Sequence, residues 1–130
     1  MFLTLDIIAE TEQRLEKWDE YKKLSKLLFE NDAEEEKIKN ECMILYNTSE
    51  DMIKNLNRDY LNLKVSIILE ELELGMNLLD KQEQELITLT YLKKHTLPMI
   101  FCEMYIDRST YYRIRKRAII KMSEVLSYYI

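Results

Sequence analysis

Arginine, lysine and hydroxyl-bearing side chains gather between residues 108 and 121, and Asp107 is the only acid between residues 107 and 118. Apolar residues recur among them at helical steps of three and four, namely Tyr111, Ile114, Ala118, Met122 and Val125. This spacing predicts a helix with one core face and one cationic face. In the major groove of DNA, the first turns of such a helix reach base edges and its later cations reach phosphates. We therefore predict base contacts from Arg108, Ser109, Tyr112 and Arg113, and phosphate contacts from Thr110, Arg115, Lys116, Arg117 and Lys121.

Three local elements must position this cationic face. Thr96 can cap a helix, so a short helix is predicted from Leu97 to about Met104. Residues 105 and 106 would form a tight turn. Asp107 is a favourable N-cap for a second helix, which makes residues 108–121 the predicted recognition helix. A short helix, a tight turn and a longer helix are typical of the helix-turn-helix motif.

Charge is distributed unevenly along the 130 residues. The formal net charge is -5, but residues 80–130 hold nine Lys or Arg against six Asp or Glu, whereas residues 1–79 hold ten against eighteen. Because phosphate binding responds to local charge, the basic C-terminal part favours a nucleic-acid partner. The alternative is an ordinary solvated amphipathic helix with a basic face. The Tyr and Thr residues interleaved with the arginines favour DNA contact over that alternative.

Helices should dominate the whole chain. It contains one Gly and one Pro, and turns draw heavily on both residue types, so few connections are expected. Hydrophobic periodicity predicts helices over roughly residues 3–30, 33–46, 50–78 and 80–94, and Asp80 with Glu83 forms a capping box for the last of them. The predicted fold is all-α. A long N-terminal helical hairpin or bundle, an acidic dimerisation or interaction region in residues 1–79, precedes a C-terminal helix-turn-helix domain in residues 80–130.

Apolar stripes indicate how the N-terminal helices pack. The first helix carries Leu15, Trp18, Tyr21, Leu24 or Ser25, and Leu28, and the second carries Ile38, Cys42 and Leu45. The stripe of the third comprises Ile53, Leu56, Tyr60, Leu63, Ile67, Glu70 or Glu71, and Leu74. So long a helix either packs on the first helix as an antiparallel hairpin or pairs with another chain. We expect a homodimer through the N-terminal helices.

Residues suited to catalysis or metal binding do not assemble into a recognisable site. Cys42, Cys102 and the single His95 cannot make a standard zinc site, and one Gly cannot supply a phosphate loop. We therefore expect no enzyme activity, metal or cofactor. Asp6 interrupts the first apolar run at once, so no signal peptide is expected, nor any membrane span. The expected location is the cytoplasm of a bacterial host.

Residues 79–126 resemble the last, promoter-reading domain of bacterial sigma factors. The resemblance is carried by LDKQEQELITLTYLKK, by the His95-Thr96-Leu97 entry to a short helix, and by the apolar spacing of the following helix. The chain resembles phage late-gene activators of the RinA and ArpU type more closely still, both in its size and in the sequence segment STYYRIRKRAI. The resemblance covers about two fifths of the chain. It implies the same base-reading positions, Arg108, Ser109, Tyr112 and Arg113, and a possible contact with RNA polymerase.

Two residues depart from the sigma-type pattern. A small residue usually stands where the first helix crosses the second, and Phe101 stands there. Either the crossing is wider, or Cys102 takes the small position with a slip of one residue. The turn often uses Gly or Asp, and Tyr105 stands there instead. A left-handed backbone at Tyr105 would cost about 1 kcal/mol.

The preferred hypothesis is a sequence-specific regulator of transcription that binds double-stranded DNA and is encoded by a phage or prophage. One alternative is a small terminase-like subunit for phage DNA packaging. Such proteins usually place the DNA-binding motif first, and the order is reversed here. Another is a helical protein-interaction adaptor whose basic helix is only surface.

Overall fold

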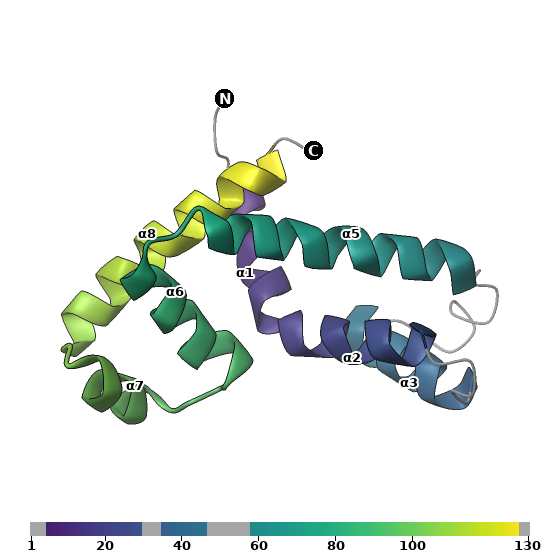
Figure 1. The fold of residues 1–130 in the computed structure, drawn as a ribbon, viewed down its shortest axis with the longest axis horizontal. Coiled ribbons are helices and arrows are strands. Elements are labelled where there is room, and N and C mark those ends of the chain that lie inside the picture. Colours follow the sequence, from purple (N-terminus) through teal and green to yellow (C-terminus); the bar gives the residue numbers. More distant parts are fainter. Residues whose placement is uncertain (1–4, 30–34, 47–57, 128–130) are drawn as a thin grey trace. The chain divides into compact units, whose positions relative to one another are not determined.

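The computed structural model describes residues 5–29, 35–46 and 58–127, and every regular element within these residues is helical (Figure 1). The elements are α1 (Leu5–Glu16), α2 (Trp18–Phe29), α3 (Glu35–Tyr46), α5 (Arg58–Asn77), α6 (Lys81–Ile87), the π-helical η1 (Thr88–Leu92), α7 (Leu97–Met104) and α8 (Arg108–Ser127). The predicted all-α class is confirmed. No helix in the described ranges combines the length and apolar character needed to cross a bilayer.

The chain divides into two compact units, which we call the C-terminal unit (Met1–Glu16 with Glu71–Ile130) and the middle unit (Lys17–Glu70). The prediction of one continuous first helix was wrong, because α1 ends at Glu16 and α2 begins at Trp18. The break at Lys17 comes from packing rather than from Gly or Pro, since α1 packs on α8 and α2 packs on α3. The predicted boundary between residues 79 and 80 divides the chain by charge and function, and it stays a prediction.

The middle unit is built on the stripe expected for α2. Trp18, Tyr21, Leu24 and Leu28 are all buried, whereas Ser25 is only partly so. On α3, Ile38 and Cys42 are buried as predicted, and the side chain of Leu45 lies outside the described part of the structure. Burial, with the nearby Glu41 carboxylate, raises the pKa of the Cys42 thiol.

The stripe predicted for α5 was wrong, because it lies on the exposed face. Tyr60, Leu63, Ile67 and Leu74 are 45–60 % exposed, whereas Leu61, Val65, Ile68 and Leu72 are buried. Of the two alternative stripe positions, Glu70 is exposed and Glu71 is buried, where it pairs with Arg14 of α1. Both sets follow steps of three and four, and they lie roughly 140° apart around a helix of 3.6 residues per turn. Periodicity alone could not choose between them. Ile53 and Leu56 of the predicted stripe lie outside the described residues.

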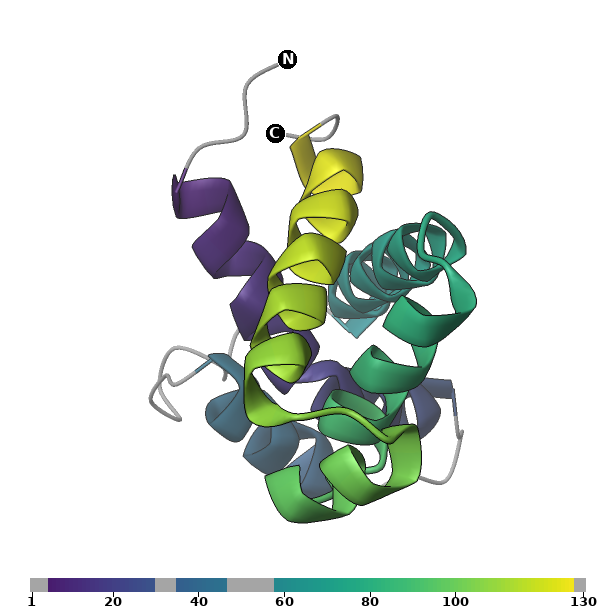
Figure 2. The same cartoon turned by 90° about the vertical axis from the view of Figure 1, so that its left-hand side faces the viewer.

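In the C-terminal unit, α1 and α6 both pack on α8 (Figure 2). Ser123 on α8 donates a buried hydrogen bond of 3.0 Å to the Thr11 hydroxyl on α1. The only glycine of the chain, Gly75 on α5, lies under Met122 of α8, and a Cβ added there would meet Met122 side-chain atoms at 3.1–3.3 Å. Glycine at this position allows the close approach of the two helices.

The helix predicted over residues 80–94 is α6 followed by a wider turn. Its capping box is confirmed, because Asp80 Oδ1 accepts from Glu83 N–H at 2.8 Å and Glu83 Oε1 accepts from Asp80 N–H at 2.9 Å. In η1 the Lys93 N–H donates to Thr88 O rather than to residue 89. Leu89 and Tyr91 are both buried, although residues two apart lie on nearly opposite sides of a regular α-helix. Opposite sides of this turn are therefore both buried in the unit.

Candidate nucleic-acid interface

The two helices predicted to carry the interface have the predicted starts and the predicted connection. Residues 97–104 form α7, with Pro98 in its first turn, and α8 begins at Arg108. Thr96 stands at the N-cap position of α7, but its side chain does not make the predicted capping hydrogen bond. Asp107 caps α8 as predicted, because its Oδ1 accepts from Thr110 N–H at 2.8 Å. Hydrogen bonds from Thr110 lower the pKa of the Asp107 carboxyl, so it stays ionised at the positive end of the helix. The short connection fixes where the first turn of α8 begins.

The two faces of α8 are those expected from its spacing. Tyr111, Ile114, Ala118, Ile119 and Met122 are buried, and Val125, the last residue of the predicted core face, is half-buried. Arg108, Ser109, Tyr112, Arg113, Lys116 and Arg117 are exposed, and Thr110 and Arg115 are half-buried. The four predicted base-reading residues therefore share the solvent side of the first two turns, and their contact with DNA stays a prediction.

The first turns of α8 are held by aromatic contacts. The Arg108 guanidinium lies 5.5 Å from the ring centre of Tyr112, within the range of a cation–π contact. Tyr112 packs edge-on against Tyr111, with ring centres 5.1 Å apart. The Tyr111 hydroxyl lies within hydrogen-bond distance, 3.0 Å, of the Thr90 hydroxyl on η1. A chain of side-chain contacts thus connects Arg108 at the surface to the core of the unit.

Phe101 contacts α8 directly, which resolves the question of the helix crossing. Its ring packs edge-on against Tyr111 with ring centres 5.6 Å apart. Cys102 is exposed, so the slip of one residue that would place it at the crossing does not occur. An aromatic pair fills the space where a small residue was expected.

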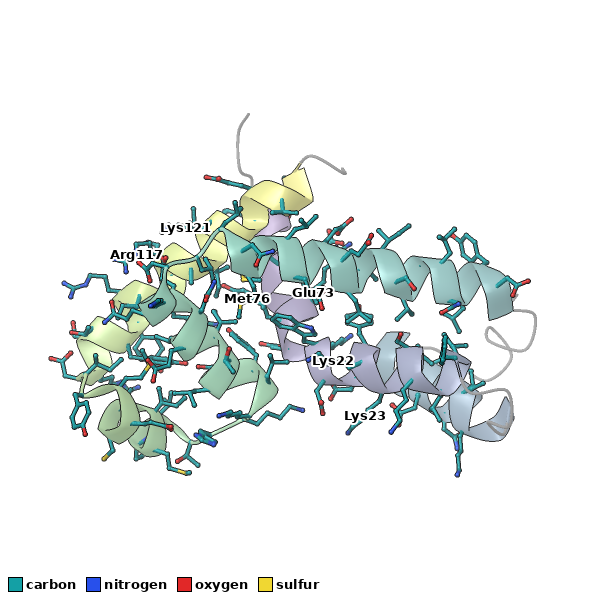
Figure 3. All side chains as sticks on the ribbon, in the orientation of Figure 1. Lys22, Lys23, Glu73, Met76, Arg117 and Lys121 are labelled. Atoms are coloured by element: carbon teal, nitrogen blue, oxygen red, sulfur yellow. The ribbon has the colours of Figure 1, made fainter. Side chains whose placement is uncertain are left out.

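Three of the four cations among the predicted phosphate-contacting residues already have partners inside the C-terminal unit. Arg115 Nε donates to the Tyr91 hydroxyl at 3.0 Å. Arg117 Nε and Lys121 Nζ reach opposite oxygens of Glu83, at 3.0 and 2.7 Å, beside the start of α6 (Figure 3). Lys116 is exposed and Thr110 lies next to the Asp107 cap. Among the cations of α8, Arg115, Arg117 and Lys121 are thus hydrogen-bonded within the unit, whereas Lys116, between the first two, is exposed.

Comparison with known proteins places the chain in a family. A family model described as "Protein of unknown function (DUF1492)" matches residues 51–123, which is more than half of the chain. The chain belongs to the DUF1492 family. No curated protein and no solved structure matches it. The DUF1492 description names no activity, so the resemblance to sigma factors and to RinA- and ArpU-type activators stays a prediction.

The residue of the DUF1492 region that sequence reasoning undervalued is Glu83. It was predicted only as a capping residue, but its side chain has no solvent exposure and it also binds Arg117 and Lys121. Burial acts against its charged form, yet hydrogen bonds from Lys121, the Asp80 backbone and Arg117 lower the pKa of Glu83 to about 2. The sequence did hold a signal for these ion pairs, because an acid in the first turn of one predicted helix can pair with basic residues on a later helix.

Tyr105 ends α7 in the left-handed conformation considered from the sequence, with φ 56° and ψ 44°. Its side chain is 95 % exposed, so little packing offsets the backbone strain. In this DUF1492 protein we expect Tyr105→Gly to raise the free energy of unfolding by about 0.5–1 kcal/mol. The measurement is urea unfolding. Tyr105→Ala is the matched control, since it removes the ring but keeps Cβ, and equal stability of the two variants would contradict the strain.

Proposed function

We propose that this DUF1492 protein is a sequence-specific regulator of transcription that binds double-stranded DNA. The observation that carries the proposal is the exposed side of the first two turns of α8, where Arg108, Ser109, Tyr112 and Arg113 face solvent after a short helix and a three-residue connection. A major groove admits one helix, and residues in the first turns of such a helix reach the base edges. The net charge of the whole chain does not oppose this, because phosphates respond to the local positive charge.

The aromatic contacts of α8 suggest how its first turns would read DNA. Arginine can bond both acceptors of a guanine in the major groove, provided that its long side chain is held in place. Tyr112 lies beneath the Arg108 guanidinium, and Tyr112 is itself packed on Tyr111. This support would lower the entropy lost when Arg108 binds a base. Besides the hydrogen bonds from Thr110, the positive charge of Arg113 lowers the pKa of the Asp107 carboxyl.

The resemblance also supports the finer parts of the proposal. Phage activators of the RinA and ArpU type and sigma-factor domains act in transcription, so we propose a phage or prophage origin and a contact with bacterial RNA polymerase. The protein would then act in the bacterial cytoplasm.

A test of DNA binding can separate this proposal from its alternatives. The intact protein is used to select sequences from a random duplex pool, and its solution mass is measured alongside. Enrichment of one short sequence is the expected result. Absence of binding even at low salt would favour the protein-interaction adaptor. A ring of many subunits that binds DNA without sequence preference would instead favour the terminase-like packaging subunit.

The exposed stripe of α5 supports a homodimer as part of the proposal. Tyr60, Leu63 and Ile67 lie on one side of α5 at steps of three and four and are 45–60 % exposed. That spacing suits pairing with an identical helix. A dimer would also place two recognition helices on one DNA, which raises affinity and sequence specificity.

We expect Leu63→Glu combined with Ile67→Glu to convert a dimer into a monomer, because each charge would be buried in the helix pair without a partner. Sedimentation at several protein concentrations measures the change. Asn62→Glu is the control, since Asn62 is exposed on α5 roughly 100° or more from the stripe. A double variant with the same mass as the wild type would contradict this interface.

A further inference from the structure

A lysine-rich groove lies in the middle unit between α2 and α3. It is an open hollow of about 500 Å³ and is lined by Lys23, Lys26, Leu27, Lys37, Asn40 and Glu41. Lys23 and Lys26 are three residues apart on α2 and so stand on neighbouring turns, whereas Lys37 comes from α3. The groove is thus lined by three lysines from two helices.

Composition of the middle unit does not account for this local positive charge. Residues 17–70 hold nine Lys or Arg and twelve Asp or Glu, so the unit is acidic as a whole. The groove reverses that balance, with three lysines against the single carboxylate of Glu41. Lys23 also lies 3.4 Å from Asp19 on the same helix, but its side chain is 62 % exposed, so this pair is weakened by solvent.

The side chains of the groove indicate the chemistry of its ligand. Ammonium groups on flexible stems act as point charges that bind phosphate oxygens from many directions. The Asn40 amide adds a neutral donor, and Lys26 and Lys37 are exposed. An enclosed small-molecule site would bury most of its ligand. Lysines this exposed suit instead a long anion that passes across the surface.

We propose that the groove between α2 and α3 binds backbone phosphates of duplex DNA, as a second contact surface that reads no sequence. The inference rests on the proposed function, which already brings DNA to the chain, and it adds phosphate contacts on a unit that the recognition helix does not include. Each phosphate neutralised by a lysine releases condensed counterions. Binding should therefore depend more steeply on salt than the contacts of α8 alone would require.

The experiment compares two triple variants of the full chain on duplex DNA. One replaces Lys23, Lys26 and Lys37 with Gln, and the control replaces Lys17, Lys22 and Lys64, which removes the same charge from the same unit outside the groove. Affinity is measured as a function of salt for each. The affinity falls as salt rises, and we expect this fall to be less steep in the groove variant. The magnitude of the slope of log K against log salt should decrease by about 2–3, at about 0.9 per phosphate contact, and it should decrease much less in the control. Unchanged helix content would show that both variants fold.

The outcomes distinguish this inference from the proposed function. If the wild type binds its selected DNA and the two variants keep the same salt slope, the groove inference is overturned and the proposed function stands. If the wild type binds no duplex DNA, both are overturned. A third outcome is that the salt slopes for DNA are the same in the wild type and both variants, while polyglutamate binds the wild type and the control but not the groove variant. The groove would then bind an acidic peptide, and the inference would again be wrong. The single variant Lys37→Gln repeats the test with only one substitution, on α3. It should decrease the magnitude of the salt slope by about 0.9.

Discussion

Glu83→Ala should lower the free energy of unfolding by about 3 kcal/mol, because one substitution removes a capping contact and both ion pairs that join α6 to α8. The Glu83 side chain has no solvent exposure, and it accepts from Asp80 N–H, Arg117 and Lys121. Loss of a buried ion-pair partner usually costs 3–5 kcal/mol, roughly, because the remaining charge is left unpaired. Here Arg117 keeps a second ion pair, with Asp80 at 3.8 Å. The Arg117 and Lys121 side chains are also 46 % and 38 % exposed and can be rehydrated, so the cost is reduced.

Glu83→Gln separates the charge of the residue from its role as a cap. Glutamine can still accept from Asp80 N–H, as Gln serves in natural capping boxes, but it presents an NH₂ donor to one of the two cations. We therefore expect a smaller loss than for alanine. Urea unfolding of both variants measures the difference, and Glu85→Ala is the control, since Glu85 is an exposed acid on the same helix. If Glu83→Ala and Glu85→Ala lost equally little stability, the ion pairs would not hold the two helices together.

The pH dependence of stability gives a second measurement of the same contacts. The pKa of Glu83 is lowered from 4.5 to about 2 in the folded protein, so the folded state favours the ionised carboxylate. Its contribution is therefore fully present above about pH 4.5 and is lost as the pH falls toward 2. The stability difference between the wild type and Glu83→Gln should shrink across this window. A constant difference from neutral pH down to pH 2 would show that the Glu83 charge is not what stabilises the fold.

Local signals allowed the sequence to predict where the helices around the candidate site begin and which of their faces are buried. Asp107 and the pair of Asp80 and Glu83 mark helix starts through contacts that span three residues, and the structure has all of these bonds. The two faces of α8 were equally predictable, because a single apolar stripe leaves one choice of buried side. Information within one or two turns of helix was sufficient in each case.

Features that depend on distant contacts could not be predicted in this way. The helix α5 carries two apolar stripes, and only packing decides that Leu61 and Val65 are buried while Leu63 is exposed. The break at Lys17 has no Gly or Pro to mark it. Glu83 and Lys121 are 38 residues apart, so a charge that looks free on a helix diagram is bonded in the structure. Counting cations on a helix face therefore overstates how many remain available for phosphate.

Base reading is therefore tested best at a cation that is exposed, such as Arg113, rather than at one that is bonded within the protein. Arg113→Ala should weaken binding to the selected DNA site by about 5- to 150-fold, which corresponds to about 1–3 kcal/mol, and weaken binding to random DNA much less. A guanidinium that bonds a base edge loses a sequence-specific contact when truncated, whereas a cation on a phosphate loses the same contact on every sequence. Affinity for both DNAs, measured at one fixed salt concentration, gives the ratio that decides the role.

The matched control is Lys116→Ala, because Lys116 is exposed three residues farther along α8. It should lower binding to both DNAs alike and reduce the magnitude of the salt slope by about 0.9. We also expect Lys121→Ala to lower both alike, but Lys121 is bonded to Glu83, so its effect on DNA has to be separated from its effect on stability. Equal losses on the two DNAs for Arg113→Ala would remove Arg113 from the base-reading set.

Tyr112→Phe extends the comparison, because it keeps the ring beneath Arg108 and removes only the hydroxyl. Specificity that survives Tyr112→Phe but falls in Tyr112→Ala would mean that Tyr112 acts by holding the arginine rather than by bonding a base.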